Sequence, residues 1–272
     1  MNPNETISFK HNDVEIKGVV GLNSKITNAS FMRSPVDIIV PFHGQYEKVV
    51  RLIESIYRVR SNPYKLTLVD DGSPNATFLS SIKSLPQLNC IRLEKQIGFG
   101  GALRVGFEAT KQPWVVFMHS DVEAQDPNWM IDLGQTLMSL KKEGVKMVSA
   151  RTNNPMHEDD RLKADRVDVG NNVVLGQGDF LPFYCAMCHR DLFKNIKGFV
   201  KEYPFAMYED QELAHRMICH GFKQAISGTS WVYHHGNVTI AEVARKNSQA
   251  VIEMENNYDR CIRDMKIYRF KK

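Results

Sequence analysis

Short apolar runs alternate with helix-like segments along the middle of this chain, and this alternation constrains its fold more than any other feature. Five runs have the length of a buried strand, at residues 36–40, 66–69, 91–93, 114–118 and 147–149. Between them apolar residues recur at helical spacing, over residues 47–59, 78–85, 100–110 and 127–142. Strands that alternate with helices in this way predict a mostly parallel sheet with helices on both faces.

The regions on either side of this alternation predict smaller units. Residues 1–33 are polar, with one short alternating strand at 14–19, and are expected to form an extension or a small hairpin. Residues 34–237 are expected to form the main domain, with later strands at 180–187 and 231–233 and a helix from Asp210 to Cys219. The segment 238–272 is predicted to be helical, with a long charged helix over 241–267.

Composition and charge exclude some classes of protein. The net charge of the 272 residues is only +4, which does not favour nucleic acid as a partner. No apolar run approaches the ~20 residues that a membrane-spanning helix needs. The first residues, from Met1 to Glu5, lack the basic and apolar regions of a signal peptide. We therefore expect a cytoplasmic protein, and peripheral contact with a membrane stays open.

The five cysteines agree with that compartment. An odd number of cysteines without a secretion signal predicts reduced thiols. Cys185 and Cys188 have the C-x-x-C spacing of some metal and redox sites, but no second pair exists and their flanks are apolar. We expect them to be core residues, with metal or redox chemistry as the alternative.

Acidic residues mark three points where ligands would gather. Asp70 and Asp71 follow the second predicted strand, Asp121 follows the fourth, and Glu209 and Asp210 open a later helix. Ligands of open α/β sheets bind beyond the carboxyl ends of the strands, so these groups are expected to line one cleft. Such a cleft suits a metal ion, a diphosphate and a base. The simpler alternative is that each residue caps a turn or stabilises a helix N-terminus.

A glycine-rich segment, from Gln96 to Gly106, precedes the third predicted helix. Glycines there allow close backbone approach, and the free N–H groups of the helix start suit an anion. The spacing of the glycines is not that of the dinucleotide fingerprint. The segment therefore predicts that a phosphate or nucleotide binds nearby, but it does not indicate which one.

Taken in order, these motifs resemble those of inverting family 2 glycosyltransferases of the GT-A fold, of the rhamnosyl- or hexosyltransferase type. The resemblance covers roughly residues 35 to 240 and rests on four motifs. They are Asp-Asp-Gly-Ser at 70–73, His-Ser-Asp at 119–121, Tyr-Glu-Asp-x-Glu-Leu-x-x-Arg at 208–216 and the histidine pair at 234–235.

The resemblance implies roles for the residues of these motifs. Asp121 and His234 would hold Mn²⁺ or Mg²⁺, with His235 as the second choice for the histidine. The nucleotide would be bound by residues from the first two strand ends, the glycine segment and the metal motif. These are Pro41, Asp70, Asp71, Gly98, Gly101, Arg104 and Ser120.

The acceptor side follows from the same resemblance. Asp210 would be the general base that takes the proton of an acceptor hydroxyl, with Glu209 and Arg216 beside it. The acidic segment 156–166 is interpreted as a mobile loop at the acceptor cleft, or else as a plain surface loop.

The implied reaction is metal-dependent transfer of a sugar, with inversion, from a UDP-, dTDP- or GDP-linked donor to a hydroxyl of a glycan or lipid-linked acceptor. Synthesis of a polysaccharide or glycoconjugate is the expected setting, and the oligomeric state is left open. His119 stands where the family usually carries the first carboxylate of the metal motif. A non-catalytic nucleotide-sugar-binding protein of the same fold is therefore the alternative.

Overall fold

The structure is a computed structural model that describes residues 5–11, 14–20, 35–59, 63–155, 160–165, 170–236, 245 and 247–268. Its centre is a nine-stranded sheet whose main path has the order β5-β4-β3-β6-β10-β8-β11-β7, with β9 paired to β11. The strands are β3 (Val36–Phe42), β4 (Tyr64–Asp70), β5 (Leu88–Arg92), β6 (Trp114–Met118), β7 (Val122–Glu123), β8 (Val145–Thr152), β9 (Val173–Val174), β10 (Cys185–His189) and β11 (Lys223–His234).

The predicted, mostly parallel sheet is confirmed. Strands β5, β4, β3 and β6 run parallel to one another, and β8 runs parallel to β11. Strand β10 lies antiparallel between β6 and β8, and β7 and β9 lie antiparallel to β11. Every residue of β3 is buried, as expected for a strand covered on both faces.

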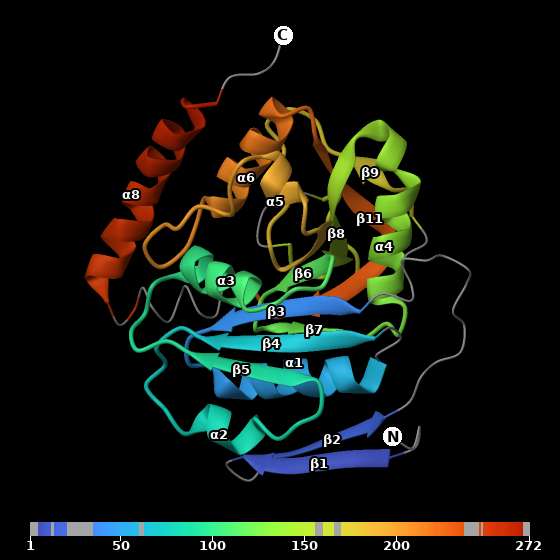
Figure 1. The fold of residues 1–272 in the computed structure, drawn as a ribbon, viewed down its shortest axis with the longest axis vertical. Coiled ribbons are helices and arrows are strands. Elements are labelled where there is room, and N and C mark those ends of the chain that lie inside the picture. Colours follow the sequence, from blue (N-terminus) through green and yellow to red (C-terminus); the bar gives the residue numbers. More distant parts are fainter. Residues whose placement is uncertain are drawn as a thin grey trace.

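Helices cover this sheet and extend beyond it (Figure 1). They are α1 (Tyr46–Val59), α2 (Phe78–Ile82), α3 (Phe99–Glu108), α4 (Trp129–Ser139), a 3₁₀ turn (Lys141–Glu143), α5 (Leu192–Asn195), α6 (Glu209–Cys219) and α8 (Ser248–Met265). Helix α1 buries one apolar face, which includes Val49, Ile53 and Ile56. Helix α8 rises along one flank of the molecule beside α6.

The predicted N-terminal strand exists and has a partner. Strands β1 (Glu5–His11) and β2 (Val14–Val20) pair antiparallel in a separate two-stranded sheet. This pair lies against α1 and α2, at the bottom of Figure 1. The boundaries of the three predicted units, 1–33, 34–237 and 238–272, stay predictions.

Two predicted strands have different limits. The strand predicted over 180–187 begins only at Cys185, because Pro182 has no N–H to donate to a strand ladder. The strand predicted over 231–233 is the end of the longer β11, which contains a bulge between Ile226 and Trp231. Gly228 lies in this bulge, where a Cβ would lie 2.0 Å from the carbonyl oxygen of Gly170.

Other predictions fall partly on residues that are not described. Of the helix predicted over 241–267, residues 241–244 and 246 lie outside the described residues, and α8 accounts for most of the remainder. Of the loop predicted over 156–166, residues 156–159 and 166 lie outside them. The part between is tied to β8, since the Thr152 N–H donates to the Leu162 carbonyl over 2.9 Å.

The interpretation of Cys185 and Cys188 as core residues is confirmed. Both lie in β10, are fully buried and form no disulfide. Side chains three positions apart in a strand point to opposite faces, so the two thiols cannot bind one ion together. Burial raises the pKa of the Cys188 thiol to about 12, which makes it unreactive at neutral pH.

Candidate metal centre and active site

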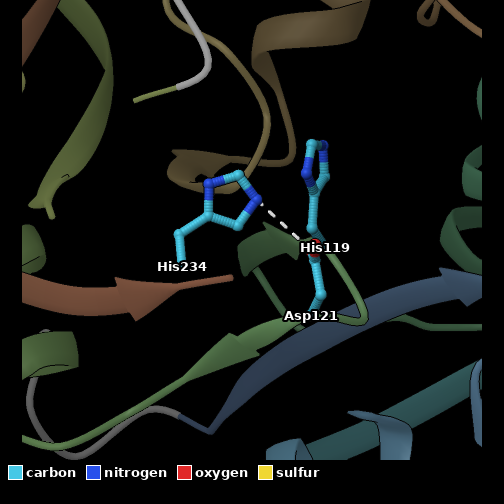
Figure 2. Close-up of side chains that lie close together, drawn as sticks. All are labelled: His119, Asp121 and His234. Carbon is cyan, nitrogen blue, oxygen red and sulfur yellow. Dashed lines mark ion pairs between the residues drawn. The ribbon is translucent and has the colours of Figure 1, made fainter. Parts of the chain in front are cut away.

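Three side chains with metal-binding atoms converge where β6 and β11 end. His119 and Asp121 follow β6, and His234 is the last residue of β11. One nitrogen or carboxylate oxygen from each lies within 4.8 Å of the others. Figure 2 shows His119 and Asp121 on one segment and His234 reaching toward them from another strand. His234 is fully buried, Asp121 is nearly so and His119 is half-buried.

The orientation of His234 leaves one ring nitrogen available. Its Nδ1 lies 2.7 Å from the Asn154 carbonyl oxygen, and because a carbonyl only accepts, Nδ1 carries the proton. The ring is also stacked on Tyr184, with centroids 5.3 Å apart. The Nε2 atom is buried, has no hydrogen bond within the described residues, and lies 3.3 Å from Asp121 Oδ1. A cation between this nitrogen and this oxygen would satisfy both.

The electrostatics of the cluster favour the ligand forms of Asp121 and His119. Burial opposes ionisation of Asp121, but nearby positive charge, first from His234 when its ring is protonated and then from His119 and Lys48, lowers the pKa of Asp121 to about 2. Burial, followed by the nearby His234, lowers the pKa of His119 to about 4 against the opposing pull of Asp121. At neutral pH the site therefore presents a carboxylate and a neutral His119 imidazole, a donor set that suits Mn²⁺.

A pair of asparagines fixes the end of β11. Asn153 Oδ1 accepts the His234 N–H over 2.8 Å, and Asn153 Nδ2 donates to the His234 carbonyl over 3.2 Å. Asn154 Nδ2 donates to the His235 carbonyl over 3.3 Å. These contacts hold His234 in the orientation that points its ring at Asp121.

His235 is directed elsewhere. Its Nε2 lies 2.8 Å from Glu123 Oε1, and its N–H donates to the Asp121 carbonyl over 3.0 Å. Among the described residues, His234 and not His235 belongs to the three-residue cluster. The two neighbouring histidines thus have different partners: His234 faces Asp121, and His235 pairs with Glu123.

The acidic residues after β4 both make contacts within the protein. Asp70 is fully buried; its Oδ1 accepts the Ser73 N–H over 2.8 Å and its Oδ2 pairs with Arg92. Asp71 Oδ1 accepts the Ile97 N–H over 2.7 Å, and Oδ2 accepts the Gly98 N–H over 3.0 Å. Burial raises the pKa of Asp71, while these two backbone hydrogen bonds oppose the rise. Asp71 therefore ties the β4 turn to the glycine segment.

The glycines of that segment have a packing role. Gly98 has φ +90°, and a Cβ there would lie 2.8 Å from the Tyr203 carbonyl oxygen. A Cβ at Gly100 would lie 2.3 Å from the Lys201 carbonyl oxygen. The start of α3 thus lies directly against the backbone of residues 201–205.

The remaining predicted nucleotide residues have different surroundings. Pro41 lies in β3, and Gly101 is buried in the first turn of α3. Ser120 is buried between His119 and Asp121. Arg104 is a third exposed and forms ion pairs with Glu202 and Glu108. A nucleotide-binding role for this set stays a prediction.

Two carboxyl groups open α6. Glu209 is almost fully buried, and neither carboxyl oxygen has a hydrogen-bond partner within the described residues. Burial, then the charge of Asp210, raises the pKa of Glu209 to about 8. Asp210 is half-buried and accepts the Gln211 N–H over 2.9 Å; burial raises its pKa to about 6. At neutral pH Asp210 is mostly ionised with a pKa near the working pH, which suits a general base.

Arg216, predicted beside Asp210, is buried and 1% exposed. Its guanidinium binds the Glu212 carboxylate twice, each at 3.0 Å, and donates to the Gly198 and Phe199 carbonyls at 2.8 and 2.6 Å. In the structure, Arg216 ties α6 to the segment after α5.

The candidate ligand that the sequence analysis did not include is His119. It was treated as a departure from a carboxylate, yet its ring reaches the cluster beside Asp121. The available signal was its position in the His-Ser-Asp motif, in the turn that follows β6 and contains Asp121. Asn153, Asn154 and Tyr184 had no signal, because their contacts depend on distant segments meeting.

The sheet order, the strand-end cluster and the helix-opening carboxylates together define a GT-A-type α/β protein with a candidate metal site. The chain matches the sequence profile of glycosyl transferase family 2 over residues 37–197, more than half of its length. This protein belongs to glycosyl transferase family 2. A search of curated protein sequences returns no match.

Solved structures show the same fold at low identity. A mannosyltransferase from Pyrobaculum calidifontis, in complex with GDP-Man and Mn²⁺, is 16% identical with a TM-score of 0.57, and the match covers 84% of this chain and 65% of that one. S. aureus TarS 1–349 is 15% identical with a TM-score of 0.56, and the match covers 80% of this chain and 65% of that one. GalNAc-T7 with UDP, GalNAc and Mn²⁺ is 14% identical with a TM-score of 0.55, and the match covers 79% of this chain and 47% of that one. This chain thus spans less than two thirds of the length of each.

No helix within the described residues is long and apolar enough to cross a membrane.

Proposed function

We propose that this protein is a metal-dependent inverting glycosyltransferase that moves a sugar from a nucleoside-diphosphate donor to a hydroxyl acceptor. The observation that carries the proposal is the buried Nε2 of His234, without a hydrogen bond and 3.3 Å from Asp121 Oδ1. A buried polar atom without a partner costs free energy, so its presence here supports a ligand.

His119, Asp121 and His234 would hold Mn²⁺ or Mg²⁺. When bound, such an ion offsets the negative charge that develops on a departing diphosphate. Two imidazoles and one carboxylate favour Mn²⁺ over Mg²⁺, because Mg²⁺ prefers oxygen ligands. The Mn²⁺ in two of the similar structures agrees with that choice.

Asp210 would carry out the proton transfer. The acceptor oxygen forms a bond to the anomeric carbon as the bond from that carbon to the diphosphate oxygen breaks. The hydroxyl proton passes to Asp210, and attack from the face opposite the leaving group inverts the configuration. The pKa of about 6 keeps Asp210 ionised at neutral pH and basic enough to accept the proton. Glu209, mostly protonated at that pH, would bind on the acceptor side as a hydrogen-bond donor.

The donor would be a UDP-, dTDP- or GDP-linked sugar. The strand ends and the glycine segment, from Pro41 and Asp70 to Arg104, would hold the nucleoside, with Ser120 near the diphosphate. GDP-Man and UDP-GlcNAc in the similar structures support this class of donor. A hexose or deoxyhexose would be transferred to a glycan or lipid-linked acceptor in glycoconjugate synthesis. The free cysteines support a cytoplasmic setting.

A screen of nucleotide sugars tests this proposal. The protein is heated with each donor, with and without Mn²⁺, and the donors that raise the melting temperature are then assayed for transfer and hydrolysis. We expect stabilisation by one class of donor that depends on Mn²⁺, and turnover that a chelator stops. Donor binding without any turnover would support the alternative, a nucleotide-sugar-binding protein. Turnover unaffected by the chelator would overturn the metal site.

A further inference from the structure

The segment that leads into α6 has an unusual backbone. Phe205, Met207 and Tyr208 have φ values of +62°, +86° and +74°. Side chains with a Cβ, and bulky ones above all, rarely adopt this left-handed region. Such conformations persist only where the surrounding structure holds them, and they concentrate at functional sites. Here they directly precede Glu209 and Asp210.

Asn257 of α8 holds this segment. The side chain is fully buried, and its Nδ2 donates to the Pro204 carbonyl over 2.9 Å and to the Ala206 carbonyl over 2.8 Å. Its Oδ1 accepts from Arg260 Nη1 over 2.6 Å. Carbonyls only accept and a guanidinium only donates, so these partners fix the orientation of the amide. Both N–H groups of the Asn257 amide therefore donate to carbonyls of the strained segment.

Other contacts join the same segment to α8 and to α3. The Cys261 thiol lies 3.6 Å from the Tyr208 carbonyl, and the rings of Tyr208 and Tyr258 meet edge to face at 5.6 Å. At the start of α3, the Phe99 N–H donates to the Phe205 carbonyl over 2.7 Å. The strained segment is thus held between two helices.

Helix α8 also lies close to the carboxylates of α6. Burial raises the pKa of the Cys261 thiol to about 12, and the charges of Glu212 and Asp210 contribute to the rise. Figure 1 shows α8 standing beside α6, although the two are separated by the whole of β11 in the chain. The helix is therefore placed to control the position of the start of α6.

We propose that Asn257 is a positioning residue for the base: by binding two carbonyls of the segment 204–206, it sets the place and burial of Asp210. This inference rests on the proposed function of Asp210. A general base must lie within hydrogen-bond reach of the acceptor hydroxyl, so a small displacement of its backbone costs rate and leaves donor binding intact.

Two variants and one control test the positioning. Asn257→Ala removes all the contacts of the amide. Asn257→Asp keeps the size and the bond to Arg260 but cannot donate to the two carbonyls. Asn256→Ala, at an exposed neighbouring position of the same helix, is the control. Hydrogen exchange of a peptide covering 203–210 reports the segment without any need for turnover.

We expect both Asn257 variants to exchange this peptide at least about tenfold faster, with β3 and β6 still protected. The value of kcat should fall on the order of 10²-fold, with the donor dissociation constant unchanged. The acidic limb of the pH–rate profile should move to lower pH, because a better hydrated Asp210 loses part of its raised pKa. Asn256→Ala should match the wild type in all three measurements.

The outcomes separate this inference from the proposed function. Wild-type protein without transfer activity for any donor would overturn the role of Asp210, while faster exchange of 203–210 would still show that Asn257 holds the segment. Active variants with wild-type kcat and exchange would overturn the positioning role alone. Asn257 variants that fail to fold would also contradict it, since the amide would then serve the whole fold.

Discussion

Asn153 pairs with both backbone groups of His234, although 81 residues separate them in the chain. The side-chain amide accepts the His234 N–H and donates to its carbonyl, as a neighbouring strand would. This pairing fixes the position of the His234 backbone. The Asn154 carbonyl, which accepts from Nδ1, then fixes the orientation of the imidazole ring. The orientation of His234, a proposed metal ligand, thus depends on Asn153, which lies outside the proposed metal site.

The first prediction concerns the two hydrogen bonds between the Asn153 side chain and the His234 backbone, which we call the clamp on His234. Asn153→Ala should weaken Mn²⁺ binding about 10–100-fold, because supporting contacts of a metal ligand usually carry that much affinity. Calorimetric titration with Mn²⁺ measures the effect. Asn154→Ala should have a smaller effect, since it loses only the bond from Nδ2 to the His235 carbonyl and keeps the backbone carbonyl that orients the ring. Equal affinity in the wild type and Asn153→Ala would show that the clamp is dispensable.

The second prediction concerns the cluster itself. Asp121→Ala should abolish Mn²⁺-dependent turnover and weaken binding of the diphosphate donor more than binding of the nucleoside. His119→Ala should also lower Mn²⁺ affinity, since its ring lies in the same cluster. His235→Ala should retain the metal, because His235 pairs with Glu123. Loss of Mn²⁺ from the His235 variant alone would reverse the assignment of the two histidines.

The third prediction concerns the base. Asp210→Asn should keep the fold and donor binding but lose on the order of 10²–10⁴ in transfer rate, whereas Glu209→Gln should be milder. The wild-type rate should fall as the pH drops through about 6, because protonation of Asp210 removes the base. Measurement of kcat against pH, with melting temperature as a control, tests both statements. A folded Asp210→Asn variant within a few-fold of the wild type would reject the role.

The fourth prediction concerns the stability cost of Glu209. Its raised pKa of about 8 means that the folded protein binds more protons than the unfolded chain between roughly pH 4.5 and 8. Stability from this group is therefore lost as the pH rises through that window. Glu209→Gln should increase the free energy of unfolding at pH 8.5 by at least about 1 kcal/mol, with little effect at pH 4.5. Denaturant unfolding at both pH values would show whether the gain depends on pH.

The fifth prediction concerns Arg216. Arg216→Met leaves the buried Glu212 carboxylate without its cation, which should cost about 3–5 kcal/mol of stability. Addition of Glu212→Gln should recover part of the loss. Arg104→Ala, which breaks exposed ion pairs, should cost about 1 kcal/mol or less. Similar losses from the two arginine variants would contradict the burial argument.

The sequence by itself determined the mostly parallel sheet and the strand end at which the candidate metal cluster lies. The strands β3, β4 and β6 are apolar runs buried on both faces, so their own composition specifies them. The metal motif at Asp121 and the helix that begins with Glu209 were visible for the same reason, because each adjoins an element with a strong local pattern.

Only the tertiary structure decided which neighbours these residues have. Three features depend on contacts between segments that are far apart in the chain. They are the proximity of His119 to His234, the clamp on His234, and the hydrogen bonds from Asn257 to residues 204–206. Gly100 reads locally as a phosphate-binding glycine, but the backbone of Lys201 occupies the space beside it. The sequence predicts Arg216 beside Asp210, but the fold buries it against the Glu212 carboxylate. Local periodicity records which face of an element is buried; it does not record which distant group lies against that face.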